Sequence, residues 1–239
     1  MRKLLVMLML GVSLGVLAQE KPIVIVELFT SEGCSSCPPA DRLLSSIVNE
    51  TYPETEVIGL SFHVDYWNYI GWKDPYSSKE FSDRQRRYAQ KFFNSSIYTP
   101  QMIVNGKHQF VGSSRSEWQK AFEKESNSDL VSLNVHSIMV DDSEISLRVN
   151  SSKATTINVA IVEKDLSQSV DRGENRGRTL SHDNVVRAFQ TKNVEGQENF
   201  RLSFPKEVDL AKSSLIVYAQ NSRNWYVSGA KKFDLNTYQ

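Results

Sequence analysis

The strongest constraint on the fold is a continuous apolar run that leads straight into the only two cysteines of this 239-residue chain. Residues 22–30, PIVIVELFT, show no alternation of polar and apolar side chains, which is typical of a strand buried on both faces. Residues 40–52, ADRLLSSIVNETY, carry apolar side chains at helical spacing, and residues 56–64, EVIGLSFHV, form a second buried run. This order predicts a right-handed parallel strand–helix–strand unit.

A helix, a hairpin and a second helix complete the pattern of the first half. Residues 78–93 and 114–126 each place apolar side chains on one face of a helix. Between them, residues 98–112 contain two short apolar runs around Asn105-Gly106, a pair that favours a tight hairpin turn.

The periodicity changes to two near residue 128. The segments that alternate are VSLNV, ISLRV, INVAIV, FRLSF, LIVYA and WYVSG. Six to eight short antiparallel strands of this kind predict a sandwich or a small barrel. The expected fold class is therefore an α/β domain at residues 20–127 followed by an antiparallel all-β, sandwich-like domain at residues 128–239.

One polar segment, residues 163–184, does not fit the strand pattern. A connection of this length inside a compact domain is either disordered or functional. Asn175, Arg178 and His182 could form a surface that binds an anion or a partner, or they could be ordinary solvated loop residues.

The first 18 residues are typical of a secretory signal peptide. Arg2 and Lys3 precede an apolar stretch that ends in the small residue Ala18. Cleavage there would change the charge balance from 28 basic and 28 acidic residues to 26 and 28. We therefore expect a periplasmic or secreted protein without membrane insertion after cleavage, and the near-neutral charge argues against nucleic acid as a partner.

The two cysteines, Cys34 and Cys37, favour redox chemistry over a structural bridge. A disulfide across so short a loop stabilises a fold by only about 2 kcal/mol. The pattern lacks the further ligands of a zinc site, so no metal is expected. A cysteine at the start of a helix is activated as a thiolate, which makes Cys34 the expected nucleophile and Cys37 the resolving thiol. Pro38-Pro39 delays the helix to about Cys37, which would weaken this activation.

The order strand, CxxC helix, strand, helix and X-Pro hairpin resembles the thioredoxin superfamily. The resemblance implies a thioredoxin-like domain at residues 20–127, in which Pro100 is cis and Thr99 pairs with the substrate backbone. A closer resemblance is to an uncharacterised family of exported bacterial thioredoxin-like proteins, a domain of unknown function. Its matching segments are VELFTSEGCSSCPPAD, HVDYWNYIGWKDPYS, YTPQ and GENRGRTLSHDNVVR.

Other residues near the cysteines are candidates for proton transfer or substrate contact. Glu27 lies seven residues before Cys34 and could relay a proton or merely end a strand. His63 and Asp65 end the second strand at the edge expected to hold the cysteines. Tyr66 and Trp67 belong to an aromatic cluster that could line a peptide groove.

We therefore expect an exported thiol-disulfide oxidoreductase that acts on the thiols or disulfides of other extracytoplasmic proteins. No organic cofactor is expected, because the glycine patterns that bind nucleotides do not occur. Two alternatives stay open. One is a copper(I) chaperone that uses the two cysteines and His63, and the other is a non-catalytic module that binds a partner and has a merely local disulfide.

Overall fold

Two buried parallel strands, β1 (Ile23–Thr30) and β2 (Glu56–His63), lie inside the sheet of the computed structural model, which describes residues 21–126 and 133–238. They form where the two unbroken apolar runs predict them. The expected signal peptide and the expected domain boundary near residue 128 lie outside the described residues. Within the described ranges, no helix is long and apolar enough to cross a membrane.

The first half also contains helices and a hairpin. These elements are α1 (Pro38–Asn49), the 3₁₀ helix η1 (Asp65–Ile70), α2 (Lys79–Lys91), β3 (Gln101–Val104), β4 (His108–Val111) and α3 (Arg115–Glu125). The predicted hairpin is confirmed, and its turn is one residue longer than the Asn105-Gly106 pair because Val104 pairs with His108.

Side chains of β1 alternate between two helical layers. Val24, Val26 and Leu28 pack with α1 and α3, whereas Ile25 and Phe29 pack with α2. The strand is buried on both faces because helices cover both, as the lack of alternation predicts. The two faces of β1 consequently lead to two different buried environments.

The second half is dominated by long strands. Its elements are β5 (Leu133–Val140), β6 (Glu144–Glu163), β7 (Leu166–Ser169), β8 (Thr179–His182), β9 (Val185–Ser203), η2 (Leu210–Lys212), β10 (Ser213–Gln220), β11 (Val227–Asp234) and η3 (Leu235–Tyr238). The segments ISLRV and INVAIV fuse into the single strand β6, which pairs with β9 along almost its whole length.

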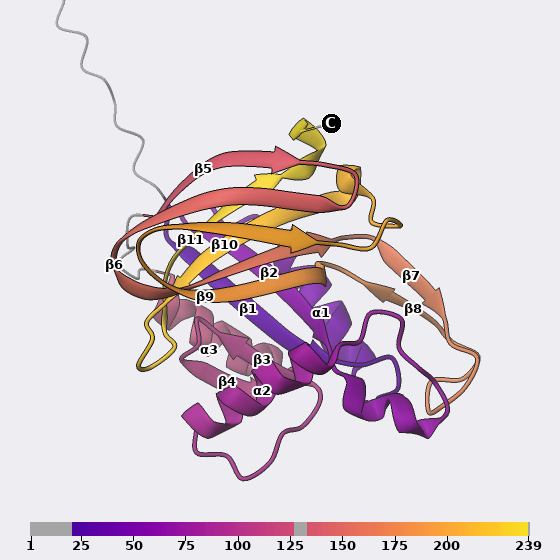
Figure 1. The fold of residues 1–239 in the computed structure, drawn as a ribbon. Coiled ribbons are helices and arrows are strands. Elements are labelled where there is room, and N and C mark those ends of the chain that lie inside the picture. The colour runs from indigo at the N-terminus through magenta and orange to yellow at the C-terminus, as the bar shows by residue number, and fades with distance from the viewer. Residues whose placement is uncertain (1–20, 127–132, 239) are drawn as a thin grey trace, which may run out of the picture.

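The expected fold class, a thioredoxin-like α/β domain followed by a separate sandwich-like β domain, is wrong. One nine-stranded mixed sheet runs through both halves, in the order β11-β10-β6-β9-β2-β1-β3-β4, with β5 paired to β6 (Figure 1). The halves join where Ser61 of β2 pairs in parallel with Val185 of β9. The Ser61 N–H donates to the carbonyl of Asn184 at 2.8 Å.

Burial explains why the sequence pattern misleads here. One face of β6 and β10 packs on β5 through residues such as Val159 and Val217. The opposite face, which alternation assigns to solvent, carries Ala160 and Tyr218 into the same core as Phe62 of β2. A period of two shows that a strand has two unlike faces, but it does not show whether another layer covers the second face.

Candidate functional site

The two cysteines form a disulfide in the turn between β1 and α1. Two successive turns lead into the helix, since the N–H of Cys34 donates to Ser31 and the N–H of Cys37 donates to Cys34, each at 3.1 Å. Cys34 Sγ lies 3.3 Å from the hydroxyl of Ser36. The disulfide therefore lies at the carboxyl end of β1, the edge at which the sequence places it.

Helix α1 begins at Pro38 with Cys37 as its N-cap, which confirms the predicted late start. Pro38 and Pro39 have no N–H group, and the N–H groups of Ala40 and Asp41 donate to the carbonyl of Cys37. A helix start normally offers free N–H groups to an anion. Here the first turn leaves none for a Cys34 thiolate, so activation of the pair needs other groups.

A buried polar cluster lies beside the disulfide. We define it by five residues that are at most 6% exposed: Glu32, Asp41, His63, Asp74 and His182. They come from the turn after β1, from α1, from the end of β2, from the loop before α2 and from β8. Asp41 follows Cys37 by one helical turn, so the two residues lie on the same side of α1.

Contacts of the two histidines with carboxylates, and with each other, hold the cluster together. His63 Nδ1 lies 2.7 Å from Asp74 Oδ2, which also accepts from the N–H of Glu32 at 2.9 Å. His182 lies between two carboxylates, with Nε2 3.3 Å from Glu32 Oε1 and Nδ1 3.9 Å from Asp41 Oδ2. The two imidazole rings meet edge to face, with centroids 4.8 Å apart.

Several polar atoms of this cluster are buried without a hydrogen-bond partner among the described residues. They are Glu32 Oε1, Asp41 Oδ1, His63 Nε2, and both ring nitrogens of His182. Buried polar groups are normally paired, and an unpaired one costs about 1–3 kcal/mol. Unpaired groups beside a disulfide leave capacity to accept or donate protons there.

Burial and charge shift the pKa values within the cluster. Burial raises the pKa of Asp41, and the charges of His182 and His63 oppose this only in part. Burial alone would lower the pKa of His63, but the charge and hydrogen bond of Asp74 raise it above its usual value. Asp41 therefore keeps its proton to a higher pH than an exposed aspartate does.

The polar segment at residues 163–184 covers the disulfide. It folds into the hairpin β7–β8, which lies alongside the loop containing η1 (Figure 1). The side-chain nitrogen of Asn175 donates to the carbonyls of Glu32 at 2.8 Å and Cys34 at 3.0 Å. Glu174 accepts the N–H of Ser35 at 3.0 Å.

Both cysteines are 0% exposed. Asn175 and His182, which the sequence left open between a functional surface and solvated loop residues, are buried in contact with the site. Arg178, at the same turn, is exposed and donates to Asn175 Oδ1 at 3.1 Å.

Glu27 is not brought together with the polar cluster. It points from β1 toward α2, where Arg84 donates to its two carboxylate oxygens at 2.6 and 2.9 Å. Tyr88 donates its hydroxyl to the same carboxylate at 2.6 Å. The carboxylate is thus held in a separate buried network on the opposite face of β1 from α1.

The predicted substrate-contacting residues lie in two segments, residues 63–67 and 99–100. The Thr99-Pro100 bond is cis, as the resemblance implies. Trp67 donates its ring N–H to Thr99 Oγ1 at 2.7 Å, and its side chain lies against Gly33, so it links the two segments. Asp65 accepts from Ser82 of α2, and the Tyr66 hydroxyl donates to Gln85 of α2 and also interacts with Thr99.

No local sequence signal marks Glu32, Asp41 or Asp74 as members of the site. Burial of a carboxylate next to CxxC depends on distant chain segments, which no local pattern reports. Within the described residues, no group of three or more His, Cys, Asp or Glu side chains has the arrangement of a metal site.

Comparisons with known proteins place the chain in a family and support its fold. The model of a family described as "Protein of unknown function (DUF1223)" matches residues 25–220. The crystal structure of an Agrobacterium tumefaciens protein is 30% identical, with a TM-score of 0.65, and the match covers 93% of this chain and 98% of that one. HBP35 of Porphyromonas gingivalis is 13% identical with a TM-score of 0.57, and the match covers 91% of this chain and 76% of that one. At this identity the match shows likeness of fold alone. Among curated proteins, none is similar enough to count as a match.

Proposed function

Because the chain belongs to this family of proteins of unknown function, we propose its activity from its own residues: it exchanges thiols and disulfides with other proteins through Cys34 and Cys37. The observation that carries the proposal is that the buried polar cluster includes Glu32, two residues before Cys34, and Asp41, one helical turn after Cys37. A structural bridge needs no proton donor. Thiol-disulfide exchange does, because each sulfur that leaves as a thiolate takes up a proton afterwards.

In the oxidising direction, a substrate thiolate attacks Sγ of Cys34. The bond between substrate and Cys34 forms as the Cys34–Cys37 bond breaks, and Cys37 leaves as a thiolate. A second substrate thiol, once ionised, attacks the substrate sulfur of this mixed disulfide and releases Cys34 as a thiolate. Two electrons pass from the substrate to the pair, and the reverse sequence reduces a substrate disulfide.

Asp41 is the proposed proton donor to the Cys37 thiolate. It lies one turn after Cys37 on α1, and burial raises its pKa, so it stays protonated where an exposed aspartate is ionised. His182 contacts Asp41 and Glu32 and is suited to pass protons onward. In this proposal the proton role, which was one of the two alternatives for Glu27, belongs to Asp41.

The local order around the cysteines supports the same activity. A strand, a CxxC turn, a helix and an X-Pro bond before a hairpin resemble the redox site of the thioredoxin superfamily. Thr99 and Pro100 are the proposed contacts for the substrate backbone, with Trp67 holding Thr99 beside the disulfide turn. The proposed partners are extracytoplasmic proteins, in keeping with the signal peptide expected at residues 1–18.

Access to Cys34 requires the hairpin β7–β8 to move. Neither cysteine is exposed, and Asn175 binds the carbonyl of Cys34 itself. A substrate thiolate reaches Sγ only after the turn that carries Asn175 has left this position. The hairpin therefore acts as a cover that limits exchange with thiols that cannot displace it.

Equilibration with glutathione tests the proposal by giving the reduction potential of the pair. A value between about −120 and −270 mV falls among known exchange catalysts. Incubation of Cys37→Ala with extracytoplasmic proteins then traps substrates as mixed disulfides with Cys34, and Cys34→Ala is the matched control that traps none. A potential below about −300 mV means that the disulfide resists reduction. The protein would then be a non-catalytic module, the alternative that burial of both cysteines favours.

A further inference from the structure

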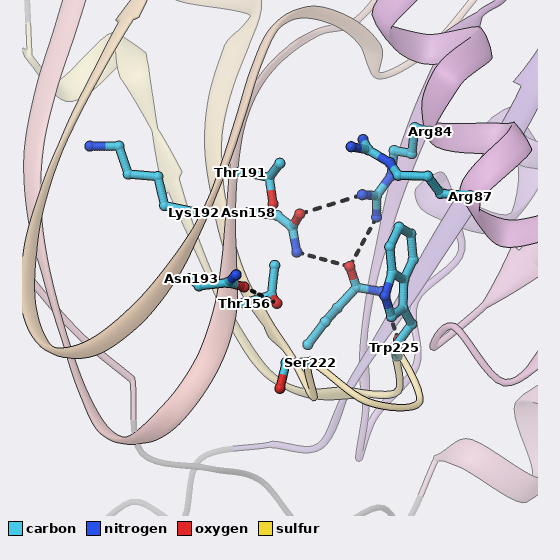
Figure 2. A pocket seen from close by; sticks show the side chains of 10 residues that line it. Arg84, Arg87, Thr156, Asn158, Thr191, Lys192, Asn193, Ser222 and Trp225 are labelled. Carbon is cyan, nitrogen blue, oxygen red and sulfur yellow. Dashed lines mark hydrogen bonds between the residues drawn. The ribbon is translucent and has the colours of Figure 1, made fainter. Parts of the chain in front are cut away.

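A second candidate site is a cavity of about 300 Å³ between α2 and the second half of the sheet. Figure 2 shows its walls, which come from α2, β6, β9, β10 and the loop before β11. The residues that line it are Arg84, Arg87, Thr156, Asn158, Thr191, Lys192, Asn193, Gln220, Ser222 and Trp225. It shares no residue with the buried polar cluster.

The cavity lies toward the opposite end of β1 from the disulfide. Gln220 donates to the carbonyl of Trp225 at 2.7 Å, and the backbone beside Trp225 pairs with Asn105, which in turn pairs with Ile25. The disulfide turn follows Thr30, about 17 Å farther along the strand at 3.3 Å per residue. The two sites can therefore be occupied independently.

The polar groups of one wall of the cavity are already hydrogen-bonded to one another. Arg84 is bound to Glu27, and it also donates to Gln220 Oε1 at 3.1 Å and Asn158 Oδ1 at 3.4 Å. Asn158 donates to Gln220 at 2.9 Å, which closes the network drawn in Figure 2. The positive charge of Arg84 is balanced by Glu27. We therefore do not expect this wall to bind the charged group of a ligand.

Arg87 has a buried donor to spare. Its Nε is buried without a hydrogen-bond partner, and no ion pair to it occurs among the described residues. Its guanidinium lies over the ring of Trp225, 5.8 Å from the centroid. Lys192, the third cation of the lining, is paired with Glu198 at 2.8 Å. Arg87, one helical turn beyond Arg84, is therefore the cation of the lining with a donor free for a ligand, while its charge also acts on Glu80.

The remaining walls offer small polar groups. Asn193 uses its side-chain oxygen to accept from Thr156 at 2.9 Å, which leaves its NH₂ group as a donor. Thr191 and Ser222 add hydroxyl groups, and Trp225 adds an aromatic surface. Hydroxyls, amides and an indole together suit a hydroxylated ring or chain, because each hydroxyl of such a ligand needs a donor or an acceptor.

We propose that this cavity binds a small hydroxylated carboxylate, of the sugar-acid class, with the carboxylate on Arg87. A planar guanidinium matches a carboxylate with two parallel hydrogen bonds. The hydroxyls meet Asn193, Thr191 and Ser222, and the apolar face lies against Trp225. The cavity volume accommodates one monosaccharide-sized ligand.

Calorimetric titration with D-glucuronate, D-glucose and inorganic phosphate tests the proposal on the whole chain. Glucuronate and glucose differ only at the carboxylate, so glucuronate should bind at least about 10-fold more tightly, since a hydrogen bond to a charged group contributes that much. Phosphate, which has the charge without the ring, should neither bind as tightly nor displace glucuronate. The indole signal of Trp225, assigned in a nuclear magnetic resonance spectrum with Trp225→Phe, should shift only with glucuronate.

Arg87→Gln should weaken glucuronate binding by at least about 10-fold. Arg86→Gln is the matched control, because Arg86 is exposed on the same helix and pairs with Asp83 instead. Asn193→Ala, on an exposed strand position, should weaken binding to a smaller extent. Three results each overturn the proposal: equal binding by Arg87→Gln and the parent, equal affinity for glucose or phosphate and glucuronate, or no binding of glucuronate at about 10 mM.

Discussion

The side-chain amide of Asn175 donates to the backbone carbonyl of Cys34 at 3.0 Å, although the two residues belong to different halves of the chain. The same amide donates to the carbonyl of Glu32 at 2.8 Å. One side chain thus fastens the hairpin β7–β8 over the disulfide turn. This contact links two parts of the sequence that local patterns treat as unrelated.

Asn175→Ala should make the disulfide easier to reach. The substitution removes two buried hydrogen bonds, each of which contributes about 0.5–1.5 kcal/mol. We expect the rate of reduction by dithiothreitol to rise by about 5- to 100-fold, because the open state of the hairpin becomes more populated. Arg176→Ala, an exposed change on the same turn, is the control. An unchanged rate in Asn175→Ala would show that the hairpin does not limit access.

Asp41→Asn should slow exchange in a manner that depends on pH. The asparagine keeps the shape of the side chain but has no acidic proton for the Cys37 thiolate. Loss of a general acid costs about 100-fold or more in rate. Because burial raises the pKa of Asp41, the ratio of parent to variant rates should be large at acidic pH and shrink as the pH rises through that raised pKa.

Stopped-flow reduction by a dithiol, followed across the pH range, measures that ratio. Ionisation of the attacking thiol affects both proteins equally and cancels. Asp171→Asn, an exposed aspartate of the β7–β8 turn, should match the parent throughout. A ratio that is constant with pH would remove Asp41 from the proposed mechanism.

The His63–Asp74 pair should give the fold a distinctive pH dependence. Burial alone would lower the pKa of His63 and raise that of Asp74, but each charge overcomes burial at the other, so His63 is raised from 6.5 and Asp74 lowered from 3.8. The contribution of His63 is fully present below pH 6.5 and is lost as the pH rises through its folded pKa. The contribution of Asp74 is present above pH 3.8 and is lost as the pH falls through its folded pKa.

Thermal unfolding at a series of pH values tests this. The melting temperature should be highest between the two ordinary values and should decline above pH 6.5. Asp74→Asn should be less stable at every pH in that window, and its decline above pH 6.5 should be flatter. Parallel curves for the parent and the variant would count against a charged His63.

The sequence predicted the parallel core and its helices because these depend on local signals. The unbroken apolar runs predicted β1 and β2, and Pro38-Pro39 predicted the late start of α1, which the structure confirms. The hairpin around Asn105-Gly106 is likewise confirmed. In each case the residues that determine the element lie within it.

The parts that sequence reasoning missed depend on contacts between distant segments. Tyr218 can be predicted as a core residue only once α2 is known to pack over its strand. The sequence predicts His182 equally well as a loop residue, whereas in the structure β8 places it between Glu32 and Asp41. Continuation of the sheet from β2 to β9 depends on the pairing of Ser61 with Val185, for which neither strand carries a signal.

Glu27→Gln should separate fold stability from exchange. Arg84 would keep its buried charge but lose its carboxylate partner, and breaking a buried ion pair in this way costs about 3–5 kcal/mol. We therefore expect a large loss in the free energy of unfolding, measured by urea denaturation. The pH profile of dithiol reduction should stay that of the parent, because Glu27 faces α2 and the disulfide turn lies beside Asp41.

Asp41→Asn should behave in the opposite way. Burial disfavours the ionised form of Asp41, so replacing it with a neutral asparagine should leave the free energy of unfolding near that of the parent at neutral pH. The pH profile of exchange should nevertheless change. A profile that changes with Glu27→Gln and not with Asp41→Asn would return the proton role to Glu27. The pair of variants thus decides between the carboxylate that the sequence pointed to and the one that the fold places next to Cys37.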